Sequence, residues 1–228
     1  MIFTKESDFE LALIQQLSNH GWEAECIEYP TEEALVKNWA DIIYKNNCSP
    51  DKLDKYPLTD SEMNQILMQI KMLKSPPMIN DWINGKVVTI KRDNQDDAMH
   101  LGKNVSLKIF DRNEIASGQS VYQIARQPQF KGLNDVSRDR RGDVMLLING
   151  MPVIHIELKR SGIPVDFAIN QIDLYNRRGL FSGLFALIQI FVAMTPEETV
   201  YFANPGNGEA LKSEFQFHWA DVNNEIIG

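Results

Sequence analysis

The chain has 228 residues, which is enough for one large domain or two small ones with a proper buried core. Its hydrophobic fraction of 43% and charged fraction of 24% are ordinary for a soluble globular protein. The two cysteines, Cys26 and Cys48, have no ligand-like spacing, which argues against a disulfide framework and a zinc site. The first residues lack the apolar core of a signal peptide, and the longest apolar stretch, residues 179–194, is too short to span a bilayer comfortably. We therefore expect a cytoplasmic protein with no membrane partner.

The net charge of −8 is unevenly distributed along the chain. Residues 1–100 carry 10 basic and 17 acidic side chains, whereas residues 101–178 carry 12 basic and 8 acidic ones. Three basic clusters lie in this middle segment: RDRR at 138–141, KR at 159–160 and RR at 177–178. A single charge run is usually only a solvated face, but three clusters around one candidate site favour contact with phosphates.

Helix signals dominate the first third of the chain. Helices are expected at about residues 7–19, 31–45 and 59–74. Ser7 and Glu10 predict a capping box at the start of the first helix, and Pro76-Pro77 should end the third.

Strand signals dominate from residue 86 onward. Strands are expected at residues 86–90, 106–110, 121–126, 143–148, 153–159 and 199–203, with a buried strand, preceded by some helix, within 184–194. A helix is expected between the strand at 153–159 and the segment 184–194, with Pro164 in its first turn and Gly179 just past its end. This order of elements predicts an α/β fold with a mixed sheet.

The segment from Asp143 to Lys159 carries the strongest functional signal. Asn149-Gly150 predicts a tight hairpin turn, because glycine supplies the positive φ that the turn needs. Side chains alternate along a strand, so His155, Glu157 and Lys159 share one face. Polar side chains are thus expected together at one end of an apolar hairpin.

The register of this hairpin decides whether Asp143 meets Glu157. A two-residue loop would place the two carboxylates on opposite faces. A three-residue loop, residues 148–150, would set Asp143 opposite His155 and diagonal to Glu157 on one face. A β-bulge in either strand would have the same effect. We predict the register that places both carboxylates on one face, with the three-residue loop.

Such a face has a direct chemical use. Two carboxylates and an ammonium at the ends of apolar strands are costly to bury unless they bind something. Mg²⁺ would relieve the repulsion between Asp143 and Glu157 and would polarise a phosphodiester. Lys159 would orient a water molecule or stabilise the developing charge. The simpler alternative is an exposed strand face with a Glu–Lys cross-pair.

These residues resemble a known nuclease signature. The pattern D-x13-E-x-K, from Asp143 to Lys159, is similar to the PD-(D/E)xK motif. More closely, GDVMLLINGMPVIHIELKRSG followed by NQIDLYNRR resembles the N-terminal nuclease domain of the restriction (R) subunit of type I restriction–modification enzymes. The resemblance is dense over residues 140–178, looser over 105–139 and 184–203, and absent from 22–100.

The resemblance implies a restriction-endonuclease-like core within one domain, residues 1–228. The core would comprise about residues 1–21 and 100–205, as a central mixed sheet flanked by helices. A mainly helical insert would occupy about residues 22–99. The R subunit is a far larger polypeptide, so the chain is expected to be a fragment of a helicase-containing subunit.

The resemblance also implies roles for individual residues. Asp143 and Glu157 would bind Mg²⁺, and Lys159 would serve hydrolysis. Gly142 stands where the signature has proline, a change that should leave the role of the aspartate intact. The activity implied is that of a type I site-specific deoxyribonuclease, an endonuclease.

Three further residues, Gln171, Tyr175 and Glu10, are candidates for supporting roles. Gln171 and Tyr175 match a Gln-x3-Tyr element of the family and lie one helical turn apart, where they would brace the lysine or contact the DNA backbone. The alternative is an ordinary amphipathic helix. Glu10 matches an acidic residue that many of these nucleases carry on their first helix, although the capping box alone would explain it. His155 is expected to pack or to form a hydrogen bond.

The partners implied by the resemblance are double-stranded DNA and the methylation and specificity subunits of the restriction complex. ATP would act only through a motor domain that is absent from this chain. The segment GNGEALKS, residues 206–213, has Leu211 where a phosphate-binding loop requires glycine.

Two alternatives stay open at this point. One is a stand-alone nuclease of the same fold in repair or phage defence. The other is a non-catalytic α/β module that binds DNA or protein and only retains the hairpin.

Overall fold

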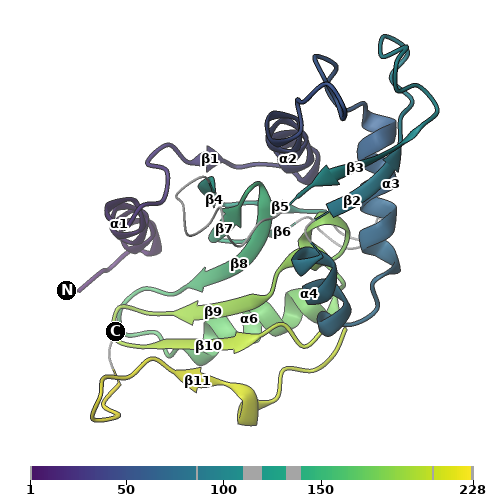
Figure 1. Cartoon of the computed structure of the whole chain (residues 1–228). Helices are drawn as coiled ribbons and strands as arrows, with labels where there is room; N and C mark the ends of the chain where they lie inside the picture. The colour runs from purple at the N-terminus through teal and green to yellow at the C-terminus, as the bar shows by residue number, and fades with distance from the viewer. Residues whose placement is uncertain (1, 86, 110–119, 132–139, 207, 227–228) are drawn as a thin grey trace.

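A seven-stranded mixed sheet forms the centre of the molecule (Figure 1). The computed structural model describes residues 2–85, 87–109, 120–131, 140–206 and 208–226. In spatial order the strands are β1 (Ile27–Glu28), β4 (Tyr122–Arg126), β7 (Val144–Ile148), β8 (Met151–Leu158), β9 (Ile190–Met194), β10 (Thr199–Ala203) and β11 (Phe217–His218). The pairs β1–β4 and β8–β9 are parallel, and the other neighbours are antiparallel.

Helices cover both faces of this sheet. Helix α1 (Glu6–Asn19) packs Phe9 and Ile14 against one face, where they meet Val144 and Ile156. The opposite face is covered by α6 (Asp166–Arg177) and by a 3₁₀ helix, η1 (Gly183–Leu187). Because alternate strand side chains point to opposite faces, the apolar runs of β7 and β8 supply both cores at once.

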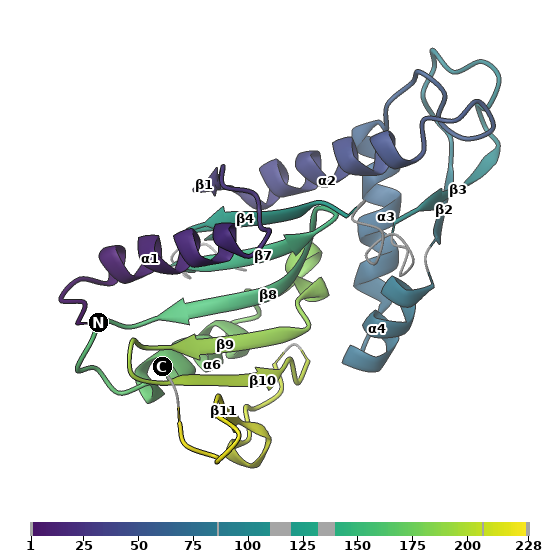
Figure 2. The ribbon, with the colours of Figure 1, turned by 60° about the vertical axis from the view of Figure 1, so that its left-hand side comes forward.

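The segment between β1 and β4 packs at one end of the sheet (Figure 2). It contains α2 (Glu32–Asn46), α3 (Asp60–Met72), α4 (Pro76–Asn84) and the antiparallel pair β2 (Val87–Lys91) and β3 (Asn104–Lys108). Helix α2 contacts the turn between β7 and β8. A Cβ atom on Gly150 would lie only 2.9 Å from the Cα of Trp39. The carboxyl end of β8 points away from this segment.

The remaining elements are short. They are the antiparallel pair β5 (Gln129–Phe130) and β6 (Arg140–Arg141), and a 3₁₀ turn, η2 (Ser213–Phe215). None of the described helices is both long and apolar enough to cross a membrane.

The fold confirms the predicted α/β class with a central mixed sheet flanked by helices. The helices expected at residues 7–19, 31–45 and 59–74 are α1, α2 and α3, and the strand expected at 199–203 is β10 with the same bounds. Residues 86, 110, 138 and 139, which fall in an expected strand or basic cluster, lie outside the described residues. Strand β1 joins the main sheet from within the expected insert, so this segment contributes to the core sheet as well. The insert boundaries stay a prediction.

One local expectation was wrong, and one helix was not predicted. Helix α3 stops before Pro76-Pro77 as expected, but this pair also begins α4, because proline fits the first turn of a helix, where its missing N–H is not needed. Ser7 and Glu10 do not form a capping box, since α1 already begins at Glu6 and its N-cap, Lys5, has no side-chain cap. The side chain of Glu10 is bound elsewhere in the fold.

Buried charges connect the β2–β3 loop to the start of α3. The fully buried guanidinium of Arg92 forms ion pairs with Glu62 at 2.7 Å and Asp97 at 3.0 Å, and it donates a hydrogen bond to the Tyr56 carbonyl. Glu62 also accepts the backbone N–H of Thr59, its partner in a complete capping box. Both carboxylates of this cluster therefore share the guanidinium of Arg92 as their partner.

Removing the guanidinium should destabilise this segment strongly. Arg92→Ala leaves the carboxylates of Glu62 and Asp97 buried without their cation, so we expect the free energy of unfolding to fall by about 3–5 kcal/mol. Urea unfolding followed by circular dichroism measures this loss. The exposed neighbour Lys91, changed to alanine, is the control and should stay within about 0.5 kcal/mol of the parent. Equal stability of the two variants would contradict the structural role given to Arg92.

Candidate active site

A β-bulge determines which side chains meet in the β7–β8 hairpin. The turn residues Asn149 and Gly150 have φ values of 52° and 80°, as a tight two-residue turn requires, and Ile148 pairs with Met151. Farther along the hairpin, Leu147 pairs with Pro152, but Leu146 pairs with Ile154. One extra residue, Val153, is thus accommodated in β8.

Because of this bulge the register differs from the predicted one, but both carboxylates still lie on one face, as predicted. The expected three-residue loop is wrong, because the turn has two residues, and His155 faces Met145 rather than Asp143. After the bulge, however, Val144 pairs with Ile156, and the next step along both strands sets Asp143 opposite Glu157. The two carboxylates therefore lie on the same face, the one covered by α6.

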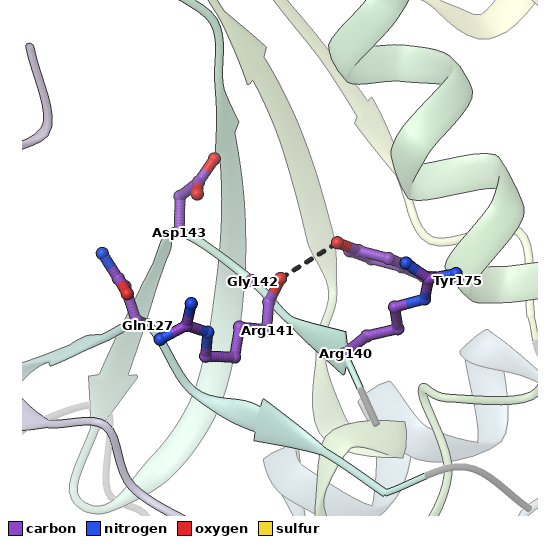
Figure 3. A pocket seen from close by; sticks show the side chains of 6 residues that line it. All are labelled: Gln127, Arg140, Arg141, Gly142, Asp143 and Tyr175. Carbon is purple, nitrogen blue, oxygen red and sulfur yellow. Dashed lines mark hydrogen bonds between the residues drawn. The ribbon is translucent and has the colours of Figure 1, made fainter. Parts of the chain in front are cut away.

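Asp143 sits at the residue immediately before β7, and its side chain is tied to the end of β8. Its Oδ2 accepts the backbone N–H of Leu158 at 2.7 Å. Its own carbonyl accepts the backbone N–H of Gln127 at 2.7 Å. The carboxylate is thus held at the junction of β4, β7 and β8, and it faces a pocket (Figure 3).

Glu157 is the most constrained group of the site. Its side chain is fully buried, and neither carboxylate oxygen has a hydrogen-bond partner among the described residues. Two cationic or potentially cationic groups lie nearby: Lys159 Nζ at 3.5 Å from Oε1 and His155 Nε2 at 3.4 Å from Oε2. Burying a carboxylate without hydrogen-bond partners costs free energy, so Glu157 is positioned for a further partner.

Lys159 follows β8 directly and is mostly buried. Its backbone N–H donates to the Met194 carbonyl at 2.9 Å, which extends the parallel pairing with β9. Its Nζ donates to the Leu158 carbonyl at 2.7 Å. The ammonium is therefore held beside Glu157 by its own main chain. The structure brings together all three residues predicted from the D-x13-E-x-K pattern.

The electrostatics of the pair are unfavourable in the absence of a cation. Burial, and next the negative charge of Glu157, raise the pKa of Asp143 to about 8. Burial raises the pKa of Glu157 to about 7, although the charge of Lys159 opposes the shift. Both carboxyls therefore hold protons far above their usual range, as two desolvated acids in one site must.

A divalent cation fits this donor set. Asp143 and Glu157 offer hard carboxylate oxygens on one face, and both Glu157 oxygens lack a partner among the described residues. Mg²⁺ is held in proteins by one or two carboxylates, with water or substrate oxygens completing its shell. In the described part of the chain no group of three or more His, Cys, Asp or Glu residues is arranged to hold a metal, so the two carboxylates would share the ion with water or substrate oxygens.

His155 packs within an aromatic cluster, as the sequence suggested. Its ring lies 5.7 Å from that of Phe130 and 5.4 Å from that of Phe181, measured between centroids. Burial lowers the pKa of His155 to about 4, so the ring is neutral at physiological pH. It also fills the space over Gly142, where a Cβ atom would lie 2.4 Å from His155 Cε1. Glycine at the signature's proline position is therefore matched to this histidine.

Gln171 and Tyr175 are brought together, but they are not bound to the lysine. The Gln171 side-chain amide donates to the Tyr175 hydroxyl at 2.6 Å, and that hydroxyl donates to the Arg141 carbonyl at 2.9 Å. Burial raises the pKa of Tyr175, so the hydroxyl keeps its proton. The pair supports β6 rather than bracing Lys159. Whether it contacts DNA stays a prediction.

Glu10 is buried at the edge of the site. Its carboxylate forms a close ion pair with Arg126 and accepts a hydrogen bond from the Gln127 side chain at 3.3 Å. Arg126 is the last residue of β4, and Gln127 follows it, before the segment β5 that pairs with β6. Glu10 therefore connects α1 to the segment beside Asp143.

The pocket beside Asp143 contains residues that the sequence did not single out individually. Its volume is about 350 Å³, and its lining residues are Gln127, Arg140, Arg141, Gly142, Asp143 and Tyr175 (Figure 3). Arg140 and Arg141 belong to a basic run visible in the sequence, but nothing marked Gln127. It reaches the pocket because it adopts a left-handed conformation, with φ of 49°, after β4.

A central mixed sheet flanked by helices, with a carboxylate pair and a lysine at one end of a hairpin, defines an α/β protein with a restriction-endonuclease-like core. The sequence model of the family described as "Type I restriction enzyme R protein N terminus" matches residues 3–210. The chain belongs to this family.

Curated relatives carry corresponding names. The chain is 32% identical over its whole length to the "Type I restriction enzyme SsaAORF53P endonuclease subunit" of Staphylococcus saprophyticus, of which it covers 22%. It is 30% identical, again over its whole length, to the "Type I restriction enzyme SauCOLORF180P endonuclease subunit" of Staphylococcus aureus, with 22% covered. It is 27% identical over 99% of its length to the "Type I restriction enzyme EcoprrI endonuclease subunit" of Escherichia coli, of which it covers 67%. The chain thus spans about a fifth of the two staphylococcal relatives.

A side chain at position 142 should collide with the histidine beneath it. In Gly142→Ala the new methyl group would lie 2.4 Å from His155 and 3.0 Å from Phe130, so we expect a loss of about 1–3 kcal/mol in the free energy of unfolding. Urea unfolding measures it. Removing the ring with His155→Val should make the same alanine substitution much less costly, as a double-mutant cycle would reveal. Additive effects would contradict the proposed contact.

The carboxyl pair should make the metal-free protein less stable as pH rises. The folded-state pKa values of Asp143 and Glu157, about 8 and about 7, lie above those of the unfolded chain, so the folded protein binds more protons. Their stabilising contribution is complete below about pH 4 and is lost as pH rises through 7 and 8, by up to about 1.4 kcal/mol per pH unit for each proton. Urea unfolding in EDTA at several pH values measures it. The variant with Asp143→Asn and Glu157→Gln should lack this decline, and an equal decline in both proteins would refute it.

Proposed function

We propose that this chain is the Mg²⁺-dependent endonuclease domain of a type I restriction R subunit, and that it hydrolyses DNA phosphodiester bonds. The observation that carries the proposal is the meeting of Asp143 and Glu157 on one buried face, with both Glu157 oxygens unsatisfied among the described residues. Membership of the R-protein family and the endonuclease names of the relatives support it.

Asp143 and Glu157 would hold the ion, and Lys159 would serve hydrolysis. A bound divalent cation supplies Lewis acidity at a phosphodiester and makes a nearby water molecule a stronger acid. Lys159 keeps its ammonium beside Glu157, where it can orient that water or stabilise negative charge at the phosphate. The main-chain hydrogen bond from Leu158 holds the carboxylate of Asp143 in place.

We propose the wider assembly from the resemblance to R subunits. In a full R subunit the nuclease would be joined to an ATP-driven motor, and the methylation and specificity subunits would deliver double-stranded DNA. The chain itself would then have no recognition sequence of its own. The net charge of −8 agrees with this division of labour, because it gives little attraction for DNA outside the basic middle segment.

Two variants separate metal binding from hydrolysis. Glu157→Ala should weaken Mn²⁺ binding by at least about tenfold, because it removes one of two carboxylate ligands. Lys159→Ala should leave Mn²⁺ binding nearly unchanged but reduce DNA cleavage by about 100-fold or more, because it removes a charge needed only during hydrolysis. Isothermal titration with MnCl₂ and plasmid cleavage by the assembled restriction complex measure the two effects.

The exposed Glu197, changed to alanine, is the matched control and should behave as the parent in both assays. If the parent chain bound no Mn²⁺, or if both site variants cleaved DNA as fast as the parent, the chain would be a non-catalytic module instead.

A further inference from the structure

The pocket beside Asp143 contains two arginines that form no ion pair with a described residue. Arg140 and Arg141 form the short strand β6, which leads through Gly142 into Asp143. In Figure 3 the Arg141 side chain extends toward Gln127 below Asp143, and Arg140 extends toward Tyr175. Both guanidinium groups therefore line the same pocket as the proposed metal ligand.

Three other described arginines have carboxylate partners, whereas Arg160 and Arg178 have none among the described residues but are exposed to solvent. Arg92 pairs with Glu62 and Asp97, Arg126 with Glu10, and Arg177 with Asp173. The Nε of Arg140, by comparison, is buried and has no hydrogen-bond partner in the part of the chain that the structure describes.

Arg140 is partly buried, and a partly buried guanidinium is costly without an anion; Arg141 beside it is exposed. In a chain with a net charge of −8, two adjacent arginines without a carboxylate partner among the described residues are positioned for an anion from outside.

The main chain of these arginines is held in place from two sides. Strand β6 pairs with β5, Arg140 opposite Phe130 and Arg141 opposite Gln129. On the other side, the Tyr175 hydroxyl donates to the Arg141 carbonyl and itself accepts the Gln171 amide. Strand β6 is thus clamped between β5 and α6, and the arginine side chains start from a fixed base.

We infer that Arg140 and Arg141 bind phosphates of the DNA backbone next to the cleaved one, and that Tyr175 and Gln171 are positioning residues for them. The inference rests on the proposed nuclease function, which supplies the polyanion. The planar guanidinium matches phosphate oxygens in a two-pronged geometry that lysine cannot reproduce. Only Gly142 separates Arg141 from Asp143 in the chain. Phosphates bound by the arginines are therefore held close to the proposed metal ligands.

DNA binding by the 228-residue chain tests the inference. The probe is a fluorescein-labelled duplex of arbitrary sequence, titrated in Ca²⁺ at several NaCl concentrations and followed by anisotropy. The variant with Arg140→Ala and Arg141→Ala should bind at least about tenfold more weakly. The slope of log affinity against log salt should also fall by about 1 to 2, because two phosphate contacts are lost.

Lys71→Ala with Lys74→Ala is the matched control. It removes the same two charges from exposed positions on and just after α3, outside this pocket, and should change affinity by less than about threefold. Equal losses in the two double variants would overturn the inference, because they would reflect only net charge. Failure of the parent to bind the duplex would overturn it as well.

The positioning role has its own readout. Tyr175→Phe keeps the ring but removes the hydroxyl that holds the Arg141 carbonyl, so it should weaken duplex binding about threefold to fivefold. The same change should have no further effect in the double-arginine variant, which a general loss of stability would not produce. An equal effect in both backgrounds would overturn the role of Tyr175.

Two further measurements separate this inference from the proposed function and identify the anion. Isothermal titration with MnCl₂ should give the parent affinity in the double-arginine variant, so loss of DNA binding with Mn²⁺ binding intact supports the inference alone. Absence of Mn²⁺ binding in the parent would instead remove the proposed function. Titration with inorganic phosphate should show no binding below about 1 mM. Tight, arginine-dependent binding of free phosphate would overturn the assignment to DNA.

Discussion

The extra residue in β8 is the constraint on which the site depends. A tight Asn-Gly turn alone gives the hairpin a register in which Asp143 and Glu157 point to opposite faces. The bulge at Val153 shifts the pairing by one residue. Next to the turn the strands pair as a two-residue turn requires, and beyond the bulge the shifted pairing brings the two carboxylates to one face. The same two strands can then pack apolar side chains into both cores and hold the two carboxylates together.

The structure holds an electrostatically unfavourable group in place with favourable packing around it. Glu157 and His155 are fully buried, and neither has a hydrogen bond from its side chain to a described residue. The aromatic cluster around His155 and the bond from Leu158 to Asp143 keep the geometry rigid. Buried polar groups without partners lower the stability of the free protein, and they are typical of binding and catalytic sites. The ligands here would be a divalent cation and a phosphate.

Two hydrogen-bond relays support the site from opposite sides. On one side Glu10 links α1 to Arg126 and Gln127. On the other, Gln171 and Tyr175 link α6 to Arg141. Both relays end on segments that border Asp143, not on Lys159. The helices therefore fix the walls of the pocket, while the lysine is held by its own strand.

The fold class, the Asn-Gly hairpin and the meeting of Asp143, Glu157 and Lys159 at its end could be predicted from the sequence, because side-chain alternation and an Asn-Gly turn are local properties. The sequence also located α2, whose cap residue Thr31 needs only its own neighbours. The other features depend on how distant segments pack. The bulge, the partner of Glu10 and the use of Gln171 and Tyr175 depend on segments up to 117 residues apart, as in the contact between Glu10 and Gln127. No local pattern encodes such contacts, since they arise only when sheet and helices pack together.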